Sequence, residues 1–416
     1  MGQIDFWSFI VNKNVIVGQS GGPTSVINSS LAGVISAAKK NGIDKVFGMK
    51  YGIKGFLRDS YVDLLEKISS QEEIELLKRT PASYLGSCRF KLPEISEDKE
   101  IYEKIFSKLK ALSIGYFFYI GGNDSMDTIK KLSDYAAIVK SDIKFMGIPK
   151  TIDNDLAMTD HTPGFGSAAK YIATAIKEIV CDCRVYDVEA VTIVEIMGRN
   201  AGWLTASAAL ARGKDCEGAD MIFLPEKPFD LEYFFERIKE LVAKKKYVVV
   251  ALSEGVKLSD GRFVCELGEA TAALDAFGHK MMSGSAKYLE NRIKSELGIK
   301  ARSIEISTLQ RCSSHFASMT DVQEAFDVGA AAVNAAIKNE TGKVICIQRI
   351  SNEPYTCIYE ANDVHEIANV EKKVPLSWIT DDNQLSCEAL DYIRPLVQGE
   401  VLPFIVDGLP LHLKLD

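Results

Sequence analysis

Short apolar runs alternate with longer stretches of mixed charged and apolar residues along most of this 416-residue chain. The apolar runs at residues 14–17, 114–120, 145–148, 190–196 and 247–252 are rich in β-branched or aromatic side chains. Such runs predict strands that are buried on both faces, as in parallel sheets. Because helix-like stretches separate them, the pattern predicts an α/β fold with parallel-rich sheets.

The same alternation predicts the remaining elements. Helices are expected at residues 25–41, 71–79, 97–112, 126–135, 164–179, 201–212, 231–245, 283–296 and 321–338. Further strands are expected at residues 43–49, 221–224, 304–306 and 344–348. Residues 51–56 are expected to form a loop because glycines interrupt them. From Glu360 on, the periodicity is weak and prolines are frequent, so this last segment is expected to wrap over the body.

Length, composition and charge narrow the class of protein. A chain of this length should hold two domains, and its 47% hydrophobic and 25% charged residues are typical of a globular protein. The net charge of −8 argues against a general nucleic-acid binder, which needs a basic surface. No apolar run approaches the ~20 residues that a membrane helix needs. The nine cysteines lack the spacing of a disulfide or zinc framework, and we interpret them as reduced thiols of a cytoplasmic protein.

The most informative stretch follows the strand expected at residues 145–148. Pro149 ends that strand, and Lys150, Asp153 and Asp155 come directly after it. In open α/β sheets, ligands bind at this carboxyl end of the strands. An aspartate there can take a proton from a hydroxyl, and a lysine can balance charge on a phosphoryl group. The alternative is a solvated loop with an Asx turn.

Two glycine-rich loops occupy equivalent places after the strands at residues 14–17 and 114–120. The first contains Gly21 and Gly22, and the second contains Gly122 and Asp124. Glycines between a strand and a helix let backbone N–H groups approach an anion. Asp124 would repel a phosphate unless Mg²⁺ lay between them. The alternatives are a tight turn and a helix cap, and neither loop has the Rossmann or Walker A pattern.

Further charged loop residues suit a sugar phosphate. They are Arg89, Arg199 in Met197-Gly198-Arg199, Glu254, Arg302 and Arg311. The last two arginines flank one predicted strand, which suits the binding of a terminal phosphate. Each of these residues taken alone also fits a surface position. The five histidines show no metal-binding spacing, and we expect His161 to have a structural hydrogen-bonding role.

Taken in order, these loops resemble those of the phosphofructokinase family. The matching pieces span roughly residues 14–350. They are Gly21-Gly22, Leu85-Gly86-Ser87-Cys88-Arg89, the segment from Gly121 to Ser125, the segment from Lys150 to Asp155, Met197-Gly198-Arg199, Glu254-Gly255 and Gln310-Arg311. ATP-dependent members typically have glycine at the positions of Asp124 and Lys150, so the chain looks like the pyrophosphate-dependent branch. The resemblance implies reversible phosphoryl transfer from pyrophosphate to the 1-hydroxyl of fructose 6-phosphate, a reaction of glycolysis and gluconeogenesis.

The resemblance also implies roles for the candidate residues. Asp153 would be the base, Thr151 would position the phosphoryl group, and Asp124 would bind Mg²⁺, with Lys150 neutralising charge. The pyrophosphate-binding set would be Gly21, Gly22, Arg89, Gly122, Asp124 and Lys150. The sugar-phosphate-binding set would be Thr151, Asp153, Asp155, Met197, Gly198, Arg199, Glu254, Arg302 and Arg311.

The family fold implies two Rossmann-like three-layer domains with the site in the cleft between them. The donor domain would be residues 1–164 plus 310–360, and the sugar-phosphate domain would be residues 165–309 plus 361–416. A homodimer or tetramer is expected. The chain departs from common family patterns at three positions: Asn123 stands where aspartate is frequent, Thr308 where histidine is frequent, and Ala190 where short ATP-dependent bacterial members have an arginine that reaches a neighbouring subunit.

Three alternatives are weighed against this interpretation. An ATP-dependent enzyme of the same fold is opposed by Asp124 and Lys150. A catalytically silent regulatory subunit is opposed by the intact Asp153, Asp155 and Arg199. A dinucleotide-dependent oxidoreductase is disfavoured because the chain lacks a G-x-G-x-x-G motif. A seven-carbon ketose phosphate stays open as a substrate.

Overall fold

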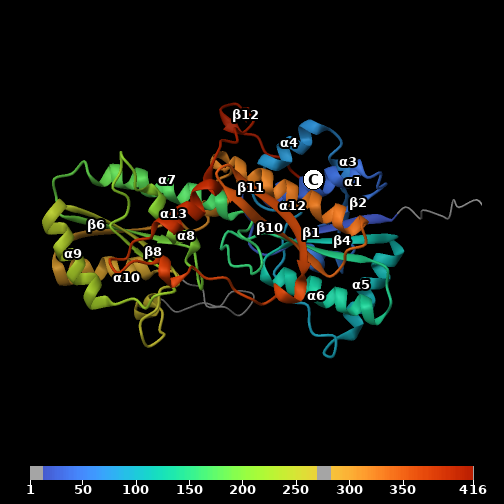
Figure 1. Ribbon diagram of the computed structural model, residues 1–416, viewed down its shortest axis with the longest axis horizontal. Helices are drawn as coiled ribbons and strands as arrows, with labels where there is room; N and C mark the ends of the chain where they lie inside the picture. The colour runs from blue at the N-terminus through green and yellow to red at the C-terminus, as the bar shows by residue number, and fades with distance from the viewer. Residues whose placement is uncertain (1–12, 269–282, 416) are drawn as a thin grey trace, which may run out of the picture.

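Two parallel-rich sheets, each covered by helices on both faces, form this protein (Figure 1). The computed structural model describes residues 13–268 and 283–415. The larger sheet has the order β11-β10-β5-β4-β1-β2-β3. Its strands are β1 (Asn14–Gln19), β2 (Val46–Met49), β3 (Tyr61–Asp63), β4 (Ile114–Gly121), β5 (Lys144–Pro149), β10 (Lys343–Asn352) and β11 (Tyr355–Asp363). Only the β2–β3 and β10–β11 pairs are antiparallel.

Alternating side chains of the central strands form the two cores of this larger unit. On one face, Val17 and Phe118 pack with helices α1 (Ile27–Lys40) and α12 (Met319–Ile337). On the other face, Ile16 and Phe117 pack with α5 (Lys99–Ala111) and α6 (Asn123–Ile138). The two helix layers are visible above and below the sheet on the right of Figure 1. Each central strand is therefore apolar on both faces, which explains its continuous hydrophobic pattern.

The smaller sheet has four parallel strands in the order β7-β8-β6-β9. They are β6 (Ala190–Ile196), β7 (Met221–Phe223), β8 (Tyr247–Ser253) and β9 (Lys300–Glu305). One face packs against α7 (Phe165–Cys183), and the other packs against α9 (Leu231–Lys245) and α10 (Ser285–Arg292). This smaller unit lies beside the larger one on the left of Figure 1. Both units are three-layered α/β structures, as the sequence pattern predicts.

Shorter elements complete the described part of the chain. The remaining helices and strands are α2 (Gly52–Phe56), α3 (Leu64–Lys67), α4 (Gln71–Arg79), α8 (Trp203–Ala206), α11 (Leu309–Cys312), α13 (Cys387–Ile393), β12 (Ile405–Val406) and β13 (Leu409–Pro410). A π-helical turn, Ile293–Leu297, follows α10. Short 3-10 segments lie at Ser207–Ala211, Val264–Leu267, Ser314–Phe316, Val364–Glu366, Leu376–Trp378 and Arg394–Val397.

The segment after β11 contacts both units. Its residues Ile393 and Leu396 belong to a core of the smaller unit, whereas Leu413 and Leu415 pack against the core of the larger unit. The Leu413 amide also donates to Thr80 Oγ1 at 2.9 Å. Leu413 and Leu415 therefore return to the unit that contains β1.

The structure corrects several sequence-based expectations. Residues 51–56 were predicted as a loop, but Gly52–Phe56 is the short helix α2, because Ile53 and Phe56 are buried in the core. Strand β11 was not predicted, since it is an edge strand whose side chains alternate between half-buried and exposed positions along most of its length. The expected strand at 304–306 begins earlier, at Lys300, because it pairs with β6 from Ala190 onwards. The expected helix at 201–212 is divided into α8 and a 3-10 segment.

Two further expectations concern the chemistry of the chain. All nine cysteines lie in the described part of the chain, and each is a free thiol there. Among residues 13–268 and 283–415, no helix combines the length and the apolar character that a membrane crossing needs. The division into a donor domain and a sugar-phosphate domain concerns roles, and it stays a prediction.

Candidate active site

The predicted loops meet at one edge of the larger sheet, where three parallel strands end. Gln19 is in register with Ile120, and Gly121 is in register with Pro149. The Lys150 amide donates to the Gly121 carbonyl oxygen at 2.9 Å. Both glycine loops and the segment that begins at Lys150 are therefore neighbours, as expected for the carboxyl ends of adjacent parallel strands.

The Lys150 side chain lies inside this junction. It is only 2% exposed, and its Nζ donates to the Gly22 carbonyl oxygen at 2.5 Å. A Cβ atom added to Gly22 would lie 3.2 Å from Arg311 Nη1, so this guanidinium is also at the first glycine loop. Burial lowers the pKa of Lys150 to about 8, although the charge of Asp153 opposes this. An anionic ligand would relieve the cost of burying these cations.

Asp153 follows Lys150 on a short turn that Thr151 organises. The Asp153 amide donates to Thr151 Oγ1 at 3.1 Å, and that hydroxyl lies 3.4 Å from Asp153 Oδ2. Burial raises the pKa of Asp153, whereas the charges of Lys150 and Arg199 lower it. Because Arg199 belongs to the smaller unit, the carboxylate lies where the two units face each other.

Three carboxyl groups near this point influence one another. Burial raises the pKa of Asp155 to about 7, and the charge of Asp153 adds to the effect. Burial likewise raises the pKa of Glu254 to about 7, and Asp153 again contributes. Carboxylates that share a low-dielectric site cannot all ionise at low cost. The group can therefore accept a proton near neutral pH, as general-base chemistry requires.

The loop of Met197, Gly198 and Arg199 is held by contacts on both sides. The Met197 amide donates to Gln310 Oε1 at 3.3 Å, and the Gly198 amide donates to Glu254 Oε1 at 3.3 Å. Gly198 has a φ of 141°, which favours glycine. The loop is thus fixed between the end of β8 and helix α11.

Asn123 and Asp124 begin helix α6 at the second glycine loop. Asn123 Oδ1 is buried and has no hydrogen-bond partner, which is unusual for a buried carbonyl oxygen. Within the described ranges, no group of three or more histidine, cysteine or acidic side chains is arranged to hold a metal ion. An amide oxygen beside one carboxylate nevertheless fits Mg²⁺, which prefers few protein oxygens and keeps waters and substrate phosphates as its other ligands.

Arg89 and Arg302 differ in where the structure places them. The loop of Arg89 packs on the first glycine loop, since the Gly21 amide donates to the Cys88 carbonyl oxygen at 3.2 Å and Ser87 Oγ donates to the Gly21 carbonyl oxygen at 2.6 Å. The charge of Arg89 contributes to lowering the pKa of Lys150. Arg302, in contrast, is exposed on β9 and pairs with Asp182 at 3.6 Å. Its assignment to the sugar phosphate stays a prediction.

Sequence reasoning missed the contribution of the C-terminal segment. Tyr392 Oη accepts a hydrogen bond from Asn154 Nδ2 at 2.9 Å, and the Lys372 amide donates to the Asp155 carbonyl oxygen at 2.7 Å. Neither residue lies in a recognisable motif, so no sequence signal pointed to them. The structural role expected for His161 is confirmed, because its ring nitrogens contact Asp160 and Glu324 at 2.8 and 2.6 Å.

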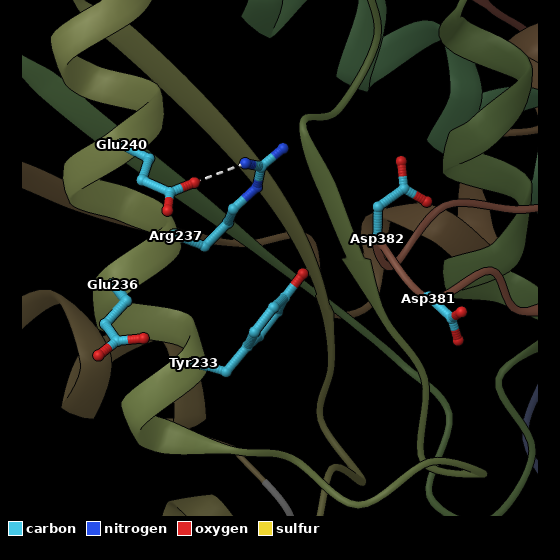
Figure 2. A pocket seen from close by; sticks show the side chains of 6 residues that line it. All are labelled: Tyr233, Glu236, Arg237, Glu240, Asp381 and Asp382. Atoms are coloured by element: carbon cyan, nitrogen blue, oxygen red, sulfur yellow. Dashed lines mark hydrogen bonds and ion pairs between the residues drawn. The ribbon is translucent and has the colours of Figure 1, made fainter.

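Two surface hollows lie away from the predicted residues. One, of about 340 Å³, lies between helix α9 and the loop that carries Asp381 and Asp382 (Figure 2). Figure 2 shows Arg237 turned towards Glu240 along the same helix, with which it pairs at 2.7 Å. The second, of about 220 Å³, is lined in part by Lys170 and Arg394. The candidate site is therefore identified by its converging loops and charges rather than by the size of a cavity.

Comparisons with known proteins agree with the sequence motifs. A family model described as phosphofructokinase matches residues 14–336. The chain is 40% identical over 410 residues to the pyrophosphate–fructose 6-phosphate 1-phosphotransferase of Xanthomonas campestris pv. campestris (strain B100), covering 98% of this chain and 97% of the relative. It is also 40% identical over 408 residues to the protein of the same name from Methylococcus capsulatus, covering 97% and 96%.

A solved structure supports the same relationship. The fold matches that of a pyrophosphate-dependent phosphofructokinase from Marinobacter aquaeolei with a TM-score of 0.85 and 38% sequence identity. The match covers 96% of this chain and 95% of that one. The similarity extends past the end of the family model at residue 336, so it includes most of the C-terminal segment.

Proposed function

This chain belongs to the phosphofructokinase family, and we propose that it transfers a phosphoryl group reversibly from pyrophosphate to the 1-hydroxyl of fructose 6-phosphate. The products are fructose 1,6-bisphosphate and phosphate. The observation that carries the proposal is the buried Lys150 ammonium, which touches the Gly22 carbonyl oxygen while its charge acts on Asp153. The Lys150 ammonium therefore interacts both with the first glycine loop, a candidate anion-binding loop, and with Asp153, the candidate base.

Asp153 is the proposed general base. It takes the proton from the 1-hydroxyl of the sugar, whose oxygen then attacks the transferring phosphorus atom. The bond from that phosphorus to the bridging oxygen breaks, and the second phosphate leaves. The contacts of Asp153 with Thr151 fix the carboxylate, and the raised pKa of Asp153 favours proton uptake. We propose that Thr151 also orients the phosphoryl group.

The pyrophosphate is proposed to bind where the two glycine loops and Lys150 meet. Backbone N–H groups near Gly21, Gly22 and Gly122 would contact its oxygens, and Lys150 and Arg89 would offset its charge. Burial disfavours the Lys150 ammonium when no anion is near it. The negative charge of a compact donor such as pyrophosphate would offset this cost. Positioning and charge neutralisation supply most of the catalysis in phosphoryl transfer.

Mg²⁺ is the proposed cofactor. Asp124 and the unpartnered Asn123 Oδ1 supply hard oxygen ligands next to the donor loops. When bound, the ion supplies charge neutralisation for the phosphate oxygens. We propose that the Asp124 side chain also excludes the nucleoside of ATP, which would favour pyrophosphate as the donor.

The sugar phosphate is proposed to bind across the gap between the units. Arg199 and Glu254 come from the smaller unit; the charge of Arg199 lowers the pKa of Asp153, and the charge of Asp153 raises that of Glu254. The larger unit would therefore hold the donor and the smaller unit the sugar. Arg311 lies against Gly22 of the donor loop, so we propose that it contacts both substrates.

A coupled assay of the purified protein tests the proposal. Fructose 6-phosphate and Mg²⁺ are supplied with either pyrophosphate or ATP, and formation of fructose 1,6-bisphosphate is followed. We expect turnover with pyrophosphate, its loss on chelation of the metal, and almost none with ATP. Turnover with ATP and none with pyrophosphate would contradict the donor assignment, and no turnover with either would contradict the activity.

A further inference from the structure

Asn154, between the two aspartates of the catalytic loop, has a left-handed backbone with a φ of 54°. Its side chain is fully buried and is held at both ends. Asn154 Oδ1 accepts from the Thr162 amide at 3.0 Å, and its Nδ2 donates to Tyr392 Oη at 2.9 Å. An asparagine tolerates this conformation better than most residues, but such strain persists only where the surroundings enforce it. One of the enforcing groups comes from helix α13, far along the chain.

Tyr392 has its ring in one unit and its hydroxyl at the loop of the other. The ring packs against Trp203 and Trp378, with centroids 5.2 and 5.6 Å away, in the core of the smaller unit. The hydroxyl donates to the Asp160 carbonyl oxygen at 2.5 Å while accepting from Asn154. The hydroxyl therefore bonds both to a backbone carbonyl oxygen and to a side chain in the segment that follows Asp153.

Lys372 makes a parallel set of contacts. Its Nζ donates to the carbonyl oxygens of Asp160 and Thr159 at 2.5 and 3.2 Å. Its amide donates to the Asp155 carbonyl oxygen at 2.7 Å, and its own carbonyl oxygen accepts from Trp203 Nε1 at 3.0 Å. The side chain and the backbone of one residue therefore hold both ends of residues 155–160.

The same segment is joined to the loop that carries Arg199. Glu371 forms an antiparallel bridge with Leu156, and its Oε1 accepts from Asn200 Nδ2 at 2.8 Å. Asn200 directly follows Arg199, and Trp203 lies three residues further on. Residues 371–392 thus connect the turn of Asp153 to the loop of Arg199 through hydrogen bonds to both.

We propose that Tyr392 and Lys372 are positioning residues for phosphoryl transfer, which hold the Asp153 turn in a fixed place relative to the Arg199 loop. The inference rests on the proposed function. Neither side chain needs to touch a substrate, because each acts through Asn154, Asp155 or Asp160. Catalysis requires the base within a few tenths of an ångström of its productive position, and a displacement near 1 Å can cost about 10²-fold in rate.

The test replaces single hydroxyl groups and separates kcat from KM. Tyr392→Phe keeps the ring that packs on Trp203 but removes the hydroxyl bonded to Asn154. The matched control is Tyr359→Phe, which removes a tyrosine hydroxyl that donates to Asp327 Oδ2 on α12 at 3.1 Å. We expect Tyr392→Phe to lower kcat about 10-fold with KM for both substrates within about twofold. Tyr359→Phe should keep the wild-type kcat, with a similar change in Tm.

A double-variant cycle shows whether Tyr392 acts through Asn154. Asn154→Gly keeps the left-handed backbone accessible and removes the side chain. In that background, Tyr392→Phe should change kcat by less than about twofold, because the two losses are not independent. If Tyr392→Phe folds poorly, Lys372→Met provides the same comparison of kcat with KM.

Three outcomes would overturn the inference. They are a wild-type kcat for Tyr392→Phe, equal losses in the Tyr392 and Tyr359 variants, and fully multiplicative effects in the double variant. The wild-type protein is assayed alongside, so the inference can fail while the proposed activity stands. A wild type that turns over with neither donor would overturn both.

Discussion

At the scale of single residues, Asp153 is distinguished from other buried aspartates by the charges around it. Burial raises its pKa while Lys150, Arg199 and Arg311 lower it, so the carboxylate is kept ionisable in a low-dielectric site. Buried carboxylates that are purely structural accept several backbone hydrogen bonds, as Asp321 does from the amides of Gly164 and Ser167. Asp153 instead contacts the Thr151 hydroxyl and is influenced by the charges of Lys150 and Arg199.

Removal of this carboxylate gives the first prediction. Asp153→Ala should lower kcat by at least ~10², the usual scale for a positioned base, with little change in KM for fructose 6-phosphate. Steady-state kinetics with pyrophosphate as donor measure both constants. A variant with near-normal turnover would show that another group takes the proton.

Asp155 permits a prediction of how stability depends on pH. Its pKa is raised to about 7 in the folded protein, against about 3.9 in an unfolded chain. Between about pH 4 and pH 7, the folded state therefore binds more protons than the unfolded chain. The stability that Asp155 contributes is present below about pH 4 and is lost as pH rises through about 7. Asp155→Asn, which stays neutral, should show a more favourable Tm relative to wild type at pH 8 than at pH 4.

Thermal unfolding of both ligand-free proteins at the two pH values checks this. The difference in Tm between variant and wild type is compared at the two pH values, because the contributions of the other titrating groups cancel in it. If the Tm difference is the same at pH 4 and pH 8, Asp155 titrates near its ordinary pKa, and the mutual influence of the three carboxyl groups is weaker than inferred.

At the scale of elements, the sequence pattern predicted the central strands better than their surroundings. Strands β1, β4, β5, β6 and β8 are apolar on both faces, so their hydrophobic runs are unambiguous. Strand β11 was not predicted because it is an edge strand whose side chains are half exposed. The loops at the strand ends were predicted to share a site because parallel strands place their carboxyl ends together.

The contribution of the C-terminal segment could not be predicted in the same way. Lys372 and Tyr392 contact the loop through hydrogen bonds to the Asp155 and Asp160 carbonyl oxygens and to Asn154, and these contacts depend on the tertiary path of an irregular segment. Hydrophobic periodicity carries no information about such a path. The exposed position of Arg302 within β9, where it pairs with Asp182, also depends on which residues of β9 pair with β6.

The junction of two loops at Gly255 gives a prediction at this scale. A Cβ atom there would lie 2.0 Å from the Arg199 carbonyl oxygen, so Gly255→Ala must displace the Arg199 loop. We expect a loss of about 1–3 kcal/mol in the free energy of unfolding, as for other overpacked sites, together with a raised KM for fructose 6-phosphate. Gly268→Ala is the control, since its Cβ would meet its neighbours at 3.6 Å or more. An unchanged KM for fructose 6-phosphate in the Gly255 variant would show that the contact between Gly255 and the Arg199 loop does not affect sugar binding.

At the scale of the whole molecule, the site is built by both units and by the segment that returns across them. Neither unit alone contains both Asp153 and Arg199. The similarity to pyrophosphate-dependent relatives covers nearly the full chain, including the segment that carries Lys372 and Tyr392. The similarity therefore extends over both loops and over the segment that connects them.

The oligomeric state is a separate prediction about the whole molecule. We expect a homodimer, on the family resemblance, and sedimentation velocity at micromolar concentration measures it. A single species near the monomer mass of 45.8 kDa would contradict the expectation. The proposed roles of Asp153 and Lys150 do not depend on the outcome, because both lie within one chain.

We propose that Lys150 and Asp124 make the site accept pyrophosphate rather than ATP. Lys150→Gly removes the ammonium at Gly22, and Asp124→Gly removes the side chain that we propose to exclude a nucleoside. A charged hydrogen bond is worth about 1.5–3 kcal/mol, so the double variant should shift the ratio of kcat/KM for the two donors towards ATP by at least ~10-fold. Lys140→Gly, at an exposed turn with a φ of 52°, is the control and should leave the ratio unchanged.

Measuring kcat/KM for pyrophosphate and ATP in wild type and the double variant tests this claim most directly. The account predicts a wild type that uses pyrophosphate with almost no activity on ATP, and a double variant in which pyrophosphate use falls and relative ATP use rises. A donor ratio that is the same in both proteins would contradict the account, even with the fold and the general base correctly assigned.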